Sequence, residues 1–105
     1  DFAKLMNMAE DGTKVGLTVL GPNMAWGREM LLWNASKLMQ TCTNSEEIVS
    51  MLTVNPAEFF GVSDRIGQLK AGLDADYLIY EGNPIEKCNA VLLETVINGE
   101  TVYQA

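Results

Sequence analysis

The run Lys14-Val15-Gly16-Leu17-Thr18-Val19-Leu20 constrains the fold most, because it is nearly continuous in apolar character. A short run of this kind is typical of a strand that is buried on both faces, as in a parallel sheet. Such a strand needs neighbours on both edges, and parallel neighbours come from further strand–helix units. The sequence nearby supplies none. We therefore expect residues 14–20 to belong to a larger sheet, in a polypeptide that was cut or processed before Asp1.

Helices are predicted on both sides of this run. Residues 2–9 carry one apolar face ahead of Gly12, where a helix would terminate, and residues 25–42 repeat apolar residues at helical spacing. The first face consists of Phe2, Leu5, Met6 and Ala9. The second consists of Met30, Leu31, Ala35, Leu38, Met39 and Cys42, with Trp26 and Trp33 broadening its buried side.

Two further helix starts follow. The segment Thr43-Asn44-Ser45-Glu46-Glu47 combines a cap candidate with carboxylates in the first turn. The segment Asn55-Pro56-Ala57-Glu58 predicts a helix with Asn55 as the cap, proline at the first helical position and glutamate at the third. Gly61 is placed to end that helix.

After Gly61 the pattern changes to strands. Residues 77–80 are predicted to form one strand, which Asn83-Pro84 ends, and residues 91–97 and 100–103 form two more. Asn98-Gly99 joins the last two as a two-residue hairpin turn, since both central residues must accept a positive φ. The predicted fold class is therefore α+β.

Composition limits the partners and the compartment. The 105 residues suit one domain, and a net charge of −7 without clustered Lys or Arg argues against nucleic acid. No apolar run approaches the ~20 residues that cross a bilayer, and no signal peptide opens the chain, so no membrane contact is expected. Cys42 and Cys88 lie far apart and match no disulfide or metal pattern, which predicts free thiols in the cytoplasm.

Few residues suit chemistry. The chain has no histidine, so Ser36 and Ser63 have no base to activate them. Asp74 and Asp76 form a carboxylate pair at i, i+2, which is typical of turn formation and capping. The structural explanation is also favoured for the remaining candidates: Glu46 and Glu47 at a helix N-terminus, Met24, Met30, Met39 and Met51 as core residues, and Cys42 as an inert thiol on an apolar face, with Cys88 exposed in a loop.

Three segments resemble the C-terminal end of metal-dependent amidohydrolases, in the group of imidazolonepropionases and prolidase-like enzymes. Residues 52–58 with Gly61 are similar to the family's "T-x-N-P-A-x-x-x-G" helix. Residues 66–76, Ile-Gly-Gln-Leu-Lys-Ala-Gly-Leu-Asp-Ala-Asp, resemble its "I-G-x-L-x-x-G-x-x-A-D" lead-in. Residues 82–85 and 96–103 are similar to its closing "D-P … V-x-x-G-x-x-V-Y".

The resemblance implies a (β/α)8 barrel beside a small β-sandwich that is built from both ends of the chain. Residues 1–61 would be the end of the barrel, with 14–20 as its last strand and 24–61 as closing helices. Residues 62–105 would be the C-terminal half of the sandwich. Gly67 and Gly72 would permit tight turns as the chain leaves the barrel, and Asp76 would start a sandwich strand.

The resemblance also implies zinc or another divalent metal in the full-length parent, held by histidines and carboxylates of several barrel strands. The last strand typically ends in "T-D-x-P", but alignment on Pro22 puts Leu20 at the aspartate position. Leucine has no lone pair for a metal, and Asn23 is a poor base. Either the alignment slips locally at this position, or the parent has diverged and is catalytically altered or inactive. We therefore expect no catalytic, cofactor-binding or metal-binding residue within this chain.

The resulting expectation is a C-terminal structural portion of a hydrolase that acts on C–N bonds in cyclic amides, amidines or dipeptides, inactive alone. Its partner would be the remainder of the parent chain. Folded alone, it would expose strand edges and form a homo-oligomer. The alternative is a free-standing, non-catalytic binding module that adds a partner's strand to its sheet.

Overall fold

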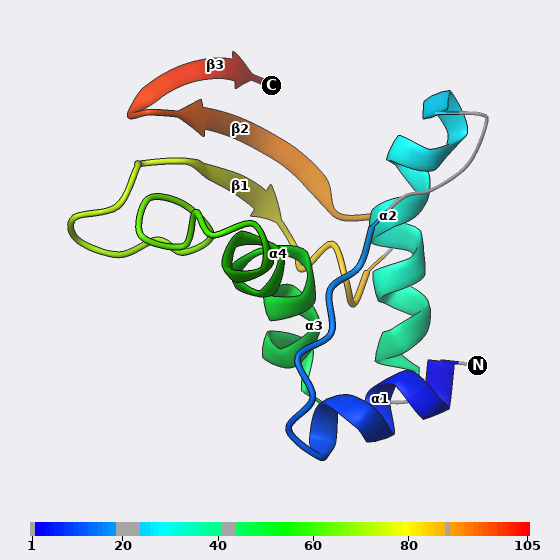
Figure 1. Ribbon diagram of the computed structural model, residues 1–105. Helices are drawn as coiled ribbons and strands as arrows, with labels where there is room; N and C mark the ends of the chain where they lie inside the picture. Colours follow the sequence, from blue (N-terminus) through cyan, green and yellow to red (C-terminus); the bar gives the residue numbers. More distant parts are fainter. Residues whose placement is uncertain (1, 19–23, 41–43, 88) are drawn as a thin grey trace.

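The computed structural model describes residues 2–18, 24–40, 44–87 and 89–105, and shows an α+β fold (Figure 1). Helices occupy the N-terminal half of these residues and strands the C-terminal half. The elements in chain order are α1 (Phe2–Glu10), α2 (Met24–Met39), α3 (Ser45–Leu52), α4 (Val54–Phe59), β1 (Tyr77–Glu81), β2 (Val91–Ile97) and β3 (Glu100–Gln104).

The core lies among the first three helices. Met6 and Ala9 of α1 are buried, which confirms the predicted face of that helix. The residues of this core cluster are Met6, Ala9, Ala35, Leu38, Ile48, Met51 and Ile85, with Leu5, Val15, Leu17, Met39 and Leu52 packed against it. Ile85 lies between β1 and β2, so the core joins the helical half to the loop that connects these strands.

The buried face of α2 is narrower than the sequence predicts. Ala35 and Leu38 are fully buried, but Met30 is 41% exposed and Trp33 is 52% exposed. Among the described residues α2 packs against α1 and α3, and these two neighbours cover only part of its circumference. The Trp33 ring instead carries the Lys37 ammonium 5.8 Å from its centroid. The side chains of Met24 and Trp26, and all of Cys42, lie outside what the structure describes.

The two predicted helix starts have different outcomes. The helix start predicted within residues 43–47 is confirmed: Asn44 is the N-cap of α3, and its Oδ1 accepts a hydrogen bond from the Glu46 N–H at 3.1 Å. The prediction for Asn55 is wrong. Thr53 precedes α4 and makes no side-chain cap bond, while Asn55 lies inside the helix and bonds elsewhere.

The strand predicted over residues 14–20 is not formed in residues 13–18, which run as an extended segment between α2 and the α3–α4 pair (Figure 1). A strand requires a paired neighbour, and the three strands of the described residues are all in the C-terminal sheet. Residues 19 and 20 lie outside the described part of the chain.

The sheet has the order β1-β2-β3, with both pairings antiparallel. Asn98 and Gly99 have φ values of 51° and 78°, which confirms the predicted hairpin turn between β2 and β3. The register shifts once in each pairing, between Ile79 and Tyr80 and between Thr95 and Val96. Such irregularities bend a strand and increase its twist.

Candidate functional site

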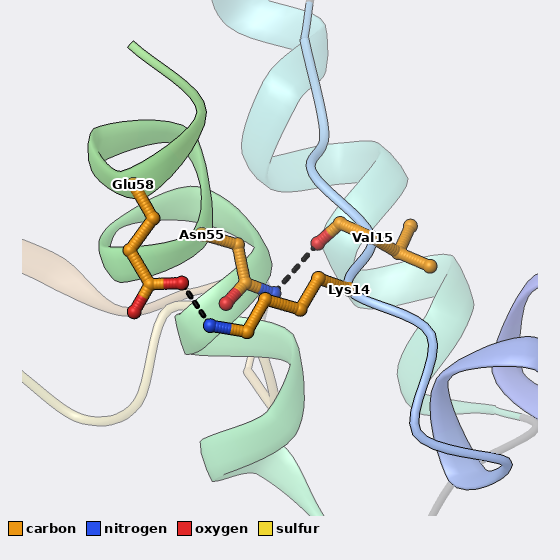
Figure 2. A network of polar contacts seen from close by, with 4 residues as sticks. All are labelled: Lys14, Val15, Asn55 and Glu58. Carbon is orange, nitrogen blue, oxygen red and sulfur yellow. Dashed lines mark hydrogen bonds and ion pairs between the residues drawn. The ribbon is translucent and has the colours of Figure 1, made fainter. Parts of the chain in front are cut away.

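The extended segment of residues 14–17 is held against α3 and α4 by backbone and side-chain hydrogen bonds. The Leu17 N–H donates to the Met51 carbonyl oxygen at 2.9 Å. Two residues earlier, Asn55 Nδ2 donates to the Val15 carbonyl oxygen at 2.8 Å (Figure 2). Val15 and Leu17 also pack against the core. Both ends of this short stretch are therefore fixed by polar and apolar contacts together.

A salt bridge from Lys14 and a close approach of Gly16 add to the contact between residues 14–17 and α4. The Lys14 ammonium pairs with the Glu58 carboxylate (Figure 2), and the two side chains are 58% and 35% exposed. Exposed ion pairs contribute about 0–1 kcal/mol, so this pair orients the segment more than it stabilises it. A Cβ on Gly16 would lie 2.9 Å from Cε2 of Phe59, so glycine allows the backbone to approach α4 closely.

This arrangement binds a chain segment and has no metal centre in the described residues. Within the ranges that the structure describes, no three His, Cys, Asp or Glu residues come together as metal ligands. Leu20 and Asn23, the residues at and after the family's aspartate position, lie outside those ranges. The chemistry available from residues 14–17 and α4 is hydrogen bonding and ion pairing within the protein.

The serine and acidic candidates have structural surroundings. Ser36 Oγ lies 2.9 Å from the Leu32 carbonyl oxygen and 3.4 Å from that of Pro84, so it links α2 to the loop after β1. Ser63 is half-buried in the turn after α4. Glu46 and Glu47 lie in the first turn of α3, where carboxylates complement the helix dipole. Cys42 and Cys88 both lie outside the described residues.

Asp74 and Asp76 serve the turns around β1, as the sequence predicted. Arg65 Nη2 donates to Asp74 Oδ2 at 3.2 Å, and the Asp74 N–H donates back to the Arg65 carbonyl oxygen at 2.8 Å. Asp76 Oδ1 accepts from the Asn98 N–H at 2.7 Å. The two carboxylates therefore have different partners and form no acid–base pair.

Gly67 and Gly72 have φ values of 101° and 94°, which confirms the tight turns predicted for them. Gly67 has a second constraint, because a Cβ there would lie 2.8 Å from Cβ of Ala57. The loop after α4 therefore folds back onto the helix at this residue.

The sequence missed the roles of Asn55 and Glu58. Their spacing resembles a local cap, but their partners Val15 and Lys14 lie 40 and 44 residues earlier. The signal that could have identified them is the absence of a neighbouring strand for residues 14–20, since some other group then has to bond that backbone.

None of the helices within the described ranges has the length and apolar character that crossing a membrane requires.

Comparison with known proteins places the chain in a family. The sequence model described as "Amidohydrolase family" matches residues 22–103. The chain is also similar to the crystal structure of an amidohydrolase from Thermotoga maritima MSB8, with a TM-score of 0.85 and 28% identity. The alignment covers 99% of this chain and 26% of that one, so this chain spans about a quarter of that amidohydrolase. No curated protein matches the chain.

Proposed function

Because the chain belongs to the amidohydrolase family, we propose that it is the C-terminal structural portion of a longer, metal-dependent hydrolase. The longer protein would cleave C–N bonds in cyclic amides, amidines or dipeptides, and this portion alone would be inactive. The observation that carries the proposal is the likeness of nearly the whole chain to about a quarter of a longer amidohydrolase.

The segment motifs support a finer assignment, to the group of imidazolonepropionases and prolidase-like enzymes. The relevant segments are residues 52–61 and 66–76, which carry the asparagine–proline helix and the glycine-rich lead-in. The change from helices to strands after Gly61 supports two parts. Residues 1–61 would close a (β/α)8 barrel, and residues 62–105 would form half of a β-sandwich.

The metal of such a hydrolase would polarise the substrate and supply hydroxide from bound water. The residues of this chain do not fit a metal centre. The sequence has no histidine, and the described residues bring no three possible ligands together. The ligands for zinc or another divalent metal would therefore come from the remainder of the longer chain. We expect the longer protein to be cytoplasmic.

Exposed apolar side chains support the remainder of that chain as the partner. Phe60 is 83% exposed and Leu69 is 72% exposed, and both come after α4 in the chain. Five exposed large apolar residues fall within residues 59–69, namely Phe59, Phe60, Val62, Ile66 and Leu69. Exposed apolar residues that gather into a patch are typical of surfaces that another part of a protein covers. All five residues of β3, which lies at an edge of the sheet, are also exposed.

The test combines a reading frame with an activity assay. An upstream frame that encodes histidines in "H-x-H" after a strand pattern supports the proposal, and a stop codon just before Asp1 favours the binding module. The longer protein, with zinc or manganese, should hydrolyse cyclic amides or dipeptides. The 105-residue chain should not, and hydrolysis by the purified chain alone would contradict the proposal.

A further inference from the structure

We propose that Asn55 is a positioning residue, whose side-chain amide recognises the backbone of residues 14–17 and fixes their path against α3 and α4. This inference goes beyond the proposed function and is independent of it, because it concerns contacts within the chain itself. It assigns the Asn-Pro-Ala-Glu-Phe segment of α4 a binding task in place of the local cap that its sequence suggests.

Four consecutive residues each contact this helix pair. Lys14 pairs with Glu58, and Gly16 approaches the Phe59 ring. Val15 accepts from Asn55, and Leu17 donates to the Met51 carbonyl oxygen. Three of the four partners lie within α4 itself, between its second and last residues. The match of successive residues to one short helix indicates recognition of an extended segment.

The bonds of Val15 and Leu17 replace the bonds of a strand neighbour. In an extended chain the carbonyl of one residue and the N–H of the second residue after it point to the same edge. Asn55 supplies a donor at the first of these groups, and Met51 supplies an acceptor at the second. In the described residues, the α3–α4 pair therefore supplies partners to two backbone groups on one edge of the segment.

The contact requires a neutral donor of this length. Val15 and Asn55 are both half-buried, and leaving a buried carbonyl unpaired costs about 1–3 kcal/mol. Alanine at position 55 would remove the donor. Aspartate would keep the shape but direct a carboxylate oxygen at a carbonyl oxygen, which is repulsive until the carboxyl is protonated.

The test is amide hydrogen exchange on the purified chain, with Leu17 as the reporter and the β2 amides as the internal reference. Asn55→Ala should lower the Leu17 protection factor by about tenfold relative to β2, as expected for the loss of a supporting hydrogen bond. Asn55→Asp should lower it further at pH 7 and regain part of it in acid, where the protonated carboxyl can donate to the Val15 oxygen. A merely space-filling role for residue 55 would produce no such pH dependence.

Asn44→Ala is the matched control, because it removes the Asn44 acceptor of the Glu46 N–H, at the opposite end of α3 from Met51. It should leave the ratio of Leu17 to β2 protection unchanged. Equal ratios in the wild type and Asn55→Ala, or identical pH profiles for the alanine and aspartate variants, would overturn the proposal.

A measurement on the unmodified chain covers the case in which a variant does not fold. The Asn55 Nδ2 protons should show nuclear Overhauser contacts to residues 15 and 16, and the absence of these contacts overturns the proposal. None of these readouts uses a substrate. If the longer protein proves inactive while Leu17 behaves as expected, the proposed function fails and the positioning role stands. If the longer protein is active while Leu17 protection does not respond to Asn55→Ala, the positioning role fails and the proposed function stands.

Discussion

The Asp76 carboxylate accepts a hydrogen bond from the backbone N–H of Asn98, with 2.7 Å between Oδ1 and N. The residue before β1 therefore holds the turn between β2 and β3. A backbone bond from the Gly99 N–H to the Ala75 carbonyl oxygen, at 2.9 Å, lies beside it. These two bonds connect all three strands at one end of the sheet.

Replacing Asp76 with alanine should reduce the free energy of unfolding by about 1 kcal/mol, because it removes a charge-assisted bond to a backbone donor. Urea denaturation followed by circular dichroism measures the change. Asp64→Ala is the control, since Asp64 is exposed and its replacement removes the same charge. Equal transition midpoints for the two variants would show that the Asp76 bond does not support the hairpin.

Gly67 and Gly72 provide a matched pair for the lead-in to β1. Both have positive φ, so alanine at either position should cost about 1–2 kcal/mol of backbone strain. At Gly67 the new Cβ would also lie 2.8 Å from the Ala57 Cβ, whereas it would meet nothing within 4 Å at Gly72. Overpacking adds about 1–3 kcal/mol, so Gly67→Ala should unfold at a clearly lower urea concentration than Gly72→Ala. The reverse order would contradict the close approach.

Features with a local physical cause could be predicted from the sequence. The cap at Asn44 depends on a side chain and an N–H two residues apart, and the hairpin at Asn98-Gly99 depends on the φ values of two adjacent residues. The positive φ of Gly72 has the same local origin, since a Cβ there would meet nothing within 4 Å. Short-range chemistry alone fixes each of these, so no distant partner had to be known.

Features that depend on distant neighbours could not be predicted. The composition of residues 14–20 is that of a buried strand, but among the described residues 13–18 meet helices and form no ladder. Asn55 has the form of a cap residue, yet its side chain bonds Val15. Trp33 is apolar enough for a core, but the elements packed against α2 in the described part of the chain leave it 52% exposed. In each case the role of the residue is decided by the elements that pack beside it, and these lie far away in the sequence.

The cap of α3 leads to a stability prediction of its own. Asn44→Ala should lower the free energy of unfolding by about 1 kcal/mol, because the Glu46 N–H loses its acceptor. Asn44→Asp keeps an acceptor oxygen at the same place and adds a charge that suits a helix N-terminus, so it should be close to the wild type. Thermal melting checks the order. An aspartate variant as unstable as the alanine variant would indicate that the cap bond is not the cause.

The exposed Phe60 side chain leads to a prediction about self-association. Because 83% of this residue is exposed, a second copy would remove apolar surface from water by covering it. The chain should therefore show an average mass in light scattering that rises with concentration, and rises further with added salt, which screens the net charge of −7. Phe60→Ser should shift this rise to concentrations at least about tenfold higher, as expected when about 1.4 kcal/mol of association energy is lost. Met8→Ser is the control, because Met8 is a half-exposed apolar residue of α1, and it should leave the curve unchanged. A monomeric mass for the wild type across the whole concentration range would contradict association through this surface and would remove the physical basis for expecting a homo-oligomer.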